Sequence, residues 1–133
     1  MTSSSALTAS HNRSVSNTCN LCDRHLHDSS GSFRVLVVDG GGSLRCALVG
    51  GNIAASAAKN GWAGIVVEGC VRDSAELAEA DVGIRALALM PLPTDRKNQG
   101  LRDGVLSIQG ITVRPGEWLV ADEDGIVVLP TPP

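Results

Sequence analysis

From residue 33 onward, short apolar runs rich in β-branched residues alternate with Ala-rich segments. The apolar runs RVLVV (34–38), GIVVE (64–68) and IRALAL (84–89) predict strands. GIVVE is uninterrupted and apolar enough to be buried on both faces, as strands of a parallel sheet are. We expect DGGGS (39–43) to end the first strand, because its glycines permit unusual backbone angles.

The Ala-rich segments between these strands predict helices. IAASAAK (53–59) has small and apolar residues that suit packing on a sheet, with Asn52 as its cap and Asn60-Gly61 at its end. AELAEA forms a shorter helix that Ser74 can cap, with Glu76 in its first turn.

Beyond residue 90 the pattern becomes entirely that of short strands and turns. Four β-rich runs are separated by turn residues such as Gln109-Gly110: VLSI (105–108), ITV (111–113), EWLVA (117–121) and IVVL (126–129). The sequence therefore predicts βαβαβ followed by a β-meander, which makes an α/β domain of layered type.

Residues 1–32 differ from the rest. They are rich in Ser, Thr and Asn, contain no acidic residue before Asp23 and show neither helical nor strand periodicity, so we interpret them as a disordered or adventitious leader to a domain at 33–133. A Ser-rich, acid-poor start is also typical of an organelle transit peptide, although Arg13 is its only basic residue before Arg24.

The leader also contains ligand types found in zinc sites, in the stretch CNLCDRHLH. Cys19, Cys22, His25 and His27 lie within nine residues, whereas a zinc finger separates its two ligand pairs by about 12 residues. Crowded ligands without a surrounding fold favour a chance arrangement over structural zinc.

Composition narrows the function. The 133 residues suffice for one domain, and a net charge of −3 with two Trp, one Phe and no Tyr gives neither the basic footprint nor the stacking platform of a nucleic-acid binder. No apolar run approaches the roughly 18–20 residues of a membrane span, and a secretory signal is absent, so we expect a cytoplasmic protein. Cys46 and Cys70 are expected to be reduced, buried structural thiols.

Two stretches at strand ends carry candidate chemistry. Gly50 to Ile53 open the first helix, where exposed N–H groups and the positive end of the dipole suit a carboxylate. Arg72 can bind a carboxylate through two parallel hydrogen bonds, and Asp73 can hold a divalent cation such as Mg²⁺. The alternative is that Arg72 and Asp73 form only a solvated pair and a cap.

The Gly-rich stretch 39–43 is a weaker candidate. It lacks both the Gly-x-Gly-x-x-Gly and the Gly-Lys-Ser/Thr patterns of nucleotide loops. A structural turn, in which the glycines let another backbone approach closely, is favoured.

Four stretches together resemble a known family: VLVVDGGGSLRCALVGGN, NGWAGIVVEGCVRD, DVGIRALA and GEWLVADEDGIVV. From about Arg34 to Leu129 the chain is similar to regulator of ribonuclease activity A and to class II 4-hydroxy-4-methyl-2-oxoglutarate aldolases. The spaced pattern Gly51-x20-Arg72-Asp73-x2-Glu76 is the most specific part of the resemblance.

The resemblance implies a swivelling β/β/α fold assembled as a homotrimer. It implies a lyase that acts on 2-oxo acids through a pyruvate enolate, by aldol cleavage, oxaloacetate decarboxylation or both, with Mg²⁺ or Mn²⁺ as cofactor. By position, Arg72 would bind substrate, Asp73 would ligate the metal, and Gly50, Gly51, Asn52 and Ile53 would contact substrate.

The chain departs from the family pattern in two ways. Aldolases of the family carry aspartate at the position of Gly51, and here Glu76 is expected to compensate, as in the decarboxylating relatives. The family's folded segment before VLVVDGG is replaced by the leader, so the domain is expected to be N-terminally shortened. The alternative function is a protein-binding regulator of a ribonuclease, and the presence of Asp73 favours chemistry instead.

Overall fold

The computed structural model describes residues 9–10, 12–16, 34–94, 100–102, 104–121 and 124–130. Its central elements are two helices and the strands that flank them: β3 (Val35–Val49), α2 (Gly51–Lys59), β4 (Gly64–Val71), α3 (Ser74–Glu79) and β5 (Gly83–Leu89). Shorter strands precede and follow them: β1 (Ala9–Ser10), β2 (Asn12–Ser16), β6 (Gly100–Arg102), β7 (Leu106–Ile108), β8 (Ile111–Val113), β9 (Trp118–Ala121) and β10 (Ile126–Leu129).

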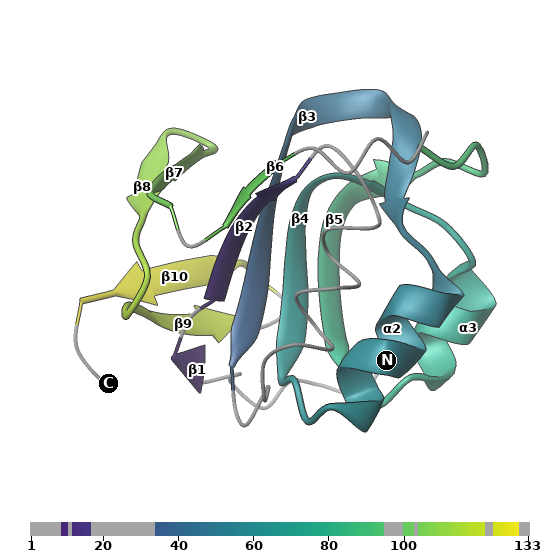
Figure 1. Cartoon of the computed structure of the whole chain (residues 1–133), viewed down its shortest axis with the longest axis horizontal. Helices are drawn as coiled ribbons and strands as arrows, with labels where there is room; N and C mark the ends of the chain where they lie inside the picture. The colour runs from purple at the N-terminus through teal and green to yellow at the C-terminus, as the bar shows by residue number, and fades with distance from the viewer. Residues whose placement is uncertain are drawn as a thin grey trace.

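The main sheet has the order β5-β4-β3-β2-β6, and all its pairings are parallel except that of β6 with β2. Helices α2 and α3 lie together to one side of this sheet, and β7 to β10 lie on the other side of the molecule (Figure 1). The predicted βαβαβ unit and the layered β/β/α fold are confirmed. The predicted meander is wrong as a single sheet, because among the described residues β7 pairs with β8 alone, while β9 pairs with β10 and β1.

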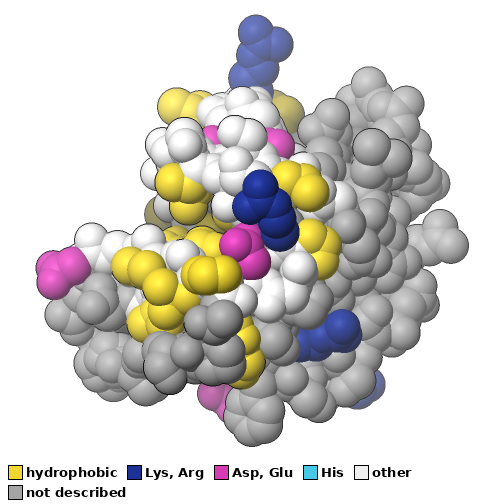
Figure 2. All heavy atoms as spheres, turned by 90° about the vertical axis from the view of Figure 1, so that its left-hand side faces the viewer, with side chains coloured by type: hydrophobic (Ala, Val, Ile, Leu, Met, Phe, Trp, Pro, Cys, Tyr) yellow, Lys and Arg dark blue, Asp and Glu magenta, His cyan; other side chains and the backbone are white. Residues whose placement is uncertain are grey.

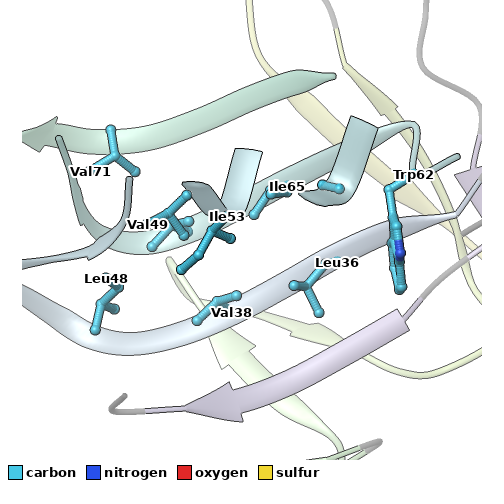
Figure 3. Packing of buried hydrophobic residues seen from close by; sticks show 10 residues of the cluster. Leu36, Val38, Leu48, Val49, Ile53, Trp62, Ile65 and Val71 are labelled. Atoms are coloured by element: carbon cyan, nitrogen blue, oxygen red, sulfur yellow. The ribbon is translucent and has the colours of Figure 1, made fainter. Parts of the chain in front are cut away.

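Alternate residues of β3 supply two separate cores. Leu36 and Val38 pack with Ile65 of β4, Ile53 of α2 and the fully buried Trp62 in the cluster beneath the helices (Figure 3). Their neighbours along β3 face the opposite layer, as the two-residue period of a strand requires. That second cluster contains Val35, Val37, Leu106, Ile108, Val113, Leu119 and Ala121. Strand β4 contacts both clusters, since Ile65 and Val67 belong to the first and the half-buried Val66 packs against the second, so the prediction that this strand is covered on both faces is confirmed.

The side of the molecule that carries β7 to β10 exposes hydrophobic side chains (Figure 2). Ile111 on β8 and Val127 on β10 are among the exposed ones. A small, shallow hollow lies next to the second core, and its lining consists of Val35, Val37, Val113, Arg114, Glu117, Trp118, Leu119 and Val128.

Strand β3 does not end at residues 39–43 as predicted, but continues to Val49. Its pairing with β4 shifts register on both sides of Ser43, so the strand bulges outward while remaining in the ladder. Gly41 and Gly42 adopt positive φ angles of 69° and 70°, which glycine tolerates. At Gly40 a Cβ would lie 2.8 Å from the carbonyl oxygen of Glu68, which confirms the predicted close approach of another backbone.

Both predicted helix starts are wrong by one or two residues. Helix α2 begins at Gly51 with Gly50 as its cap, so Asn52 lies in the first turn. Helix α3 begins at Ser74, and Asp73 occupies the cap position in a left-handed conformation. The prediction placed each helix start after a residue with a good capping side chain. It failed because neither actual cap residue makes a side-chain cap hydrogen bond. The predicted end of α2 at Asn60 is confirmed.

Part of the expected leader forms strands. Asn12–Ser16 pairs with β3 and β6, and Ala9–Ser10 pairs with β9. The expectation of a leader without strands is wrong for these residues, because pairing with a neighbouring strand can impose an extended backbone on a segment that lacks periodicity. Cys19, Cys22, His25 and His27 lie outside the described residues.

Two cysteines lie in the described part of the chain, and both are free thiols. Cys70 is buried and Cys46 is half-buried, so the expectation of a reduced and buried thiol is confirmed in full only for Cys70. Within the described part of the chain, no helix has the length and hydropathy needed to cross a membrane.

Gly40→Ala should destabilise the protein by about 1–3 kcal/mol, because the added methyl group would press on Leu48 and on the β4 backbone. Gly104→Ala is the matched control, since a Cβ there meets nothing within 4 Å, and it should be neutral or slightly stabilising. Urea unfolding followed by circular dichroism measures both. Equal stability of the two variants would contradict the close approach.

Candidate functional site

The predicted site residues lie at the carboxyl ends of β3 and β4. Val49, the last residue of β3, is the register partner of Val71, the last residue of β4. The Arg72 backbone N–H donates to the Val49 carbonyl oxygen at 2.9 Å, which continues the ladder one residue beyond β4. Because the strands are parallel, the start of α2 after β3 and the Arg72-Asp73 pair after β4 emerge at the same edge of the sheet.

Asp73 joins the two segments. Its carboxylate Oδ2 accepts the backbone N–H of Gly51 at 3.0 Å, across 22 residues of sequence. The first turn of α2 contains no acidic residue, so Asp73 places a negative charge at the positive end of that helix from outside it. Asp73 itself has a φ of 61°, a left-handed conformation that aspartate tolerates better than most residues.

The two glycines at the start of α2 make room for acidic and basic side chains. A Cβ on Gly50 would lie 2.8 Å from Asp73 Oδ2 and 3.1 Å from Arg72 Nε. A Cβ on Gly51 would overlap the Glu76 carboxylate. The Glu76 side chain therefore occupies the space that a side chain at position 51 would fill, and both carboxylates lie against the same short stretch of backbone.

Arg72 is only loosely tied to its neighbour. Its Nη1 atom lies 3.8 Å from Asp73 Oδ2, and the two side chains are 37% and 33% exposed. An ion pair this long and this exposed contributes little to stability. The guanidinium is therefore accessible to solvent, and a ligand carboxylate can reach it from the surface.

Asn52 and Ile53 enter the site through their backbone. The Asn52 side chain is exposed, whereas the Ile53 side chain is buried in the core beneath the helices. Both residues belong to the first turn of α2, whose N–H groups have no partner one turn back within the helix. The structure thus brings the predicted residues 50–53, 72, 73 and 76 together.

Two neighbours of the site were not predicted from the sequence. The Val49 carbonyl holds the Arg72 backbone, and the Met90 N–H donates to the Val71 carbonyl at 2.9 Å, which brings the end of β5 beside Arg72. Both contacts are made by main-chain atoms of apolar residues, which carry no signal in a sequence. Strand register alone could have indicated them.

The residues at this edge fit a hard divalent cation held by few protein ligands. The Asp73 carboxylate lies beside the Arg72 guanidinium and next to Gly50, and the Glu76 carboxylate lies next to Gly51. The start of α2 therefore has two carboxylates and one guanidinium close by, which leaves an excess of negative charge. No cluster of three or more His, Cys, Asp or Glu side chains occurs among the described residues. Mg²⁺ needs no such cluster, since it commonly binds one or two carboxylates and completes its shell with water and substrate oxygens.

The fold and the site together define a layered α/β domain with a helix start beside an Arg-Asp pair at the carboxyl edge of a parallel sheet. A protein-family comparison matches residues 6–128 to the family described as "RraA-like: Aldolase/RraA". The chain therefore belongs to the RraA-like family, and the matched range includes β1 and β2.

Individual relatives agree with this assignment. A protein of Albidiferax ferrireducens named "Putative 4-hydroxy-4-methyl-2-oxoglutarate aldolase" is 45% identical over 161 aligned positions, covering 84% of this chain and 93% of the relative. One of the same name from Alkalilimnicola ehrlichii is 62% identical over 98 residues, covering 74% of this chain and 61% of the relative. The chain thus spans less than two thirds of the length of the second relative.

A solved structure shares the fold closely. The protein described as the RNA-processing inhibitor RraA from Thermus thermophilis superposes with a TM-score of 0.90 at 41% identity, over 97% of this chain and 82% of that chain.

Asp73→Ala should cost about 1–2 kcal/mol of stability, because it removes the acceptor for the Gly51 N–H and places alanine at a left-handed backbone position. Asp73→Asn should cost less than half of that, since asparagine tolerates this conformation and keeps an oxygen acceptor. Urea unfolding compares the two variants. A larger loss of stability for Asp73→Asn than for Asp73→Ala would contradict a stabilising role for the hydrogen bond from Gly51 N–H to the Asp73 carboxylate.

Proposed function

We propose that this protein is a divalent-metal-dependent lyase that cleaves 2-oxo acids through a pyruvate enolate. The supporting observation is the convergence of Arg72, Asp73 and Glu76 on the start of α2. Candidate substrates are 4-hydroxy-4-methyl-2-oxoglutarate, which the names of the relatives suggest, and oxaloacetate.

Arg72 binds the substrate carboxylate in this proposal. Its guanidinium is accessible and can form two parallel hydrogen bonds to a carboxylate. Arg72 lies next to the start of α2, where the N–H groups of Asn52 and Ile53 and the positive end of the helix dipole favour an anion. The 2-oxo acid is thereby held with its keto oxygen toward Asp73 and Glu76.

Asp73 would hold the divalent cation, Mg²⁺ or Mn²⁺, with the Glu76 carboxylate nearby at the start of α2. When bound, the cation supplies Lewis acidity to the keto oxygen and offsets the excess negative charge of the two carboxylates. The Gly51 N–H keeps the Asp73 carboxylate oriented at the strand end. Gly50 and Gly51 leave the space that the carboxylates need.

Glu76 moves the proton in this proposal. In aldol cleavage a base takes the proton of the C4 hydroxyl, the C3–C4 bond breaks, and its electron pair becomes the enolate of pyruvate. In oxaloacetate the same bond breaks with release of CO₂. In both reactions the enolate is then protonated at C3, and an exposed carboxylate beside the helix start can exchange that proton with water.

The resemblance also supports a homotrimer as the assembled form, and a second function as a protein-binding regulator of a ribonuclease. The regulator alternative is favoured by the similarity to the RNA-processing inhibitor RraA. Sedimentation of the purified chain measures the assembly. If the chain inhibits a ribonuclease and turns over neither 4-hydroxy-4-methyl-2-oxoglutarate nor oxaloacetate, the protein is a regulator of the ribonuclease and not a lyase.

Oxaloacetate decarboxylation by the purified chain should require Mg²⁺ or Mn²⁺ and should stop when a chelator is added. Arg72→Lys, Asp73→Asn and Glu76→Gln should each lower kcat/KM by about 100-fold, the scale of a lost charge-stabilising or proton-transferring group. Initial rates of pyruvate formation measure this effect.

Glu79→Gln is the matched control, because Glu79 is an exposed carboxylate on the same helix as Glu76. Its kcat/KM should equal that of the unchanged chain. Turnover that survives both the chelator and Asp73→Asn would contradict the metal-dependent mechanism.

A further inference from the structure

The last irregularity of β3 lies directly before the candidate site. Ala47 pairs with Cys70 of β4, and Val49 pairs with Val71. Two steps along β3 thus match one step along β4, so Leu48 is the extra residue of a bulge. Bulges beside functional sites re-aim the residues that follow them, and the start of α2 follows this one.

The bulge decides how far the start of α2 reaches along the sheet edge. The Arg72 N–H donates to the Val49 carbonyl at 2.9 Å, and the Gly51 N–H donates to Asp73 Oδ2 at 3.0 Å. Without the extra step, every residue after Ala47 would lie one position further along the edge, a shift of about 3.3 Å. A shift of that size would break both hydrogen bonds.

The residue before the bulge is fixed by the segment that follows β5. The Ala47 N–H donates to the Leu92 carbonyl at 2.8 Å, and the Ala47 carbonyl accepts the Thr94 N–H at 3.1 Å. Because Ala47 is held in this way, the extra residue has to be accommodated between Ala47 and Val49.

The Leu48 side chain fills space that two glycines leave. It is 5% exposed and belongs to the cluster beneath the helices, at the end away from Trp62 (Figure 3). A Cβ on Gly40 of β3 would lie 2.4 Å from Leu48 Cδ1, and a Cβ on Gly69 of β4 would lie 3.1 Å from the same atom. The δ methyl group therefore packs against both strands, and close packing of this kind fixes the direction in which the extra residue points.

We propose that Leu48 is a positioning residue, whose side chain holds the last bulge of β3 and so keeps the start of α2 against Arg72 and Asp73. Its effect on turnover rests on the proposed lyase function, whereas its effect on the two hydrogen bonds does not. Loss of the δ methyl groups gives the extra residue room to move. A misplacement of about 1 Å at a site can lower a rate by about 100-fold.

Hydrogen exchange of the purified full chain measures the positioning directly. Leu48→Val removes the δ methyl groups and keeps a branched apolar side chain. It should raise the exchange rates of the Arg72 and Gly51 amides by about 10-fold relative to those of residues 65–67. Leu36→Val is the matched control, because Leu36 is a buried leucine of the same strand and cluster that pairs in the regular ladder. It should leave that ratio unchanged.

Oxaloacetate decarboxylation with Mg²⁺ is the second measurement. Leu48→Val should lower kcat/KM by roughly 10- to 100-fold, because it moves the helix start relative to Arg72 and Asp73. Leu36→Val should leave kcat/KM unchanged, since it disturbs the core without touching the bulge.

The same exchange ratio in the two variants would overturn the positioning role and leave Leu48 an ordinary core residue. A raised ratio for Leu48→Val with unchanged kcat/KM would overturn the role of the bulge in turnover. An unchanged chain that does not turn over oxaloacetate would overturn the lyase function alone, because the exchange ratio still decides whether Leu48 positions the helix start.

Discussion

The parallel pairing of β3 with β4 is the constraint on which the rest of the structure depends. It buries alternate residues of β3 in two different cores and determines which residues emerge together at the carboxyl edge of the sheet. A one-residue slip would exchange the two faces and move Leu36 and Val38 into the core where Val35 and Val37 now pack. The same slip would separate Val49 from Val71, and with them the two halves of the site.

The bulges within β3 show how this register is kept although the strand is long. Residues 40–46 leave the regular ladder on both sides of Ser43, and the chain returns to pair Ala47 with Cys70 and Val49 with Val71. Gly40 allows the β4 backbone to approach at the first bulge. The excursion therefore does not disturb the strand end, where the position of the backbone matters most.

The site combines weak interactions whose value lies in position rather than in stability. The pair of Arg72 and Asp73 is long and exposed, and α3 has no buried residue. The site residues are positioned by the main chain. The Arg72 N–H donates to the Val49 carbonyl, the Gly51 N–H donates to the Asp73 carboxylate, and Gly51 leaves space for the Glu76 side chain. Charged groups held by a rigid sheet edge but still open to water are suited to binding and releasing a small charged ligand.

The sequence by itself determined the βαβαβ unit and the layered class, because apolar periodicity is a local property of the chain. It also indicated Arg72, Asp73 and the start of the first helix as candidate residues from their positions at strand ends, and the resemblance to a family added Glu76. It misplaced the helix starts, since Gly50 and Asp73 cap without a side-chain cap hydrogen bond. Only the tertiary structure decided that residues 12–16 pair with β3, that the C-terminal strands divide into separate sheets, and that Leu89 at the end of β5 pairs with Val71. The physical reason is that strand pairing joins backbone groups far apart in the chain, and backbone groups are the same for every residue except proline.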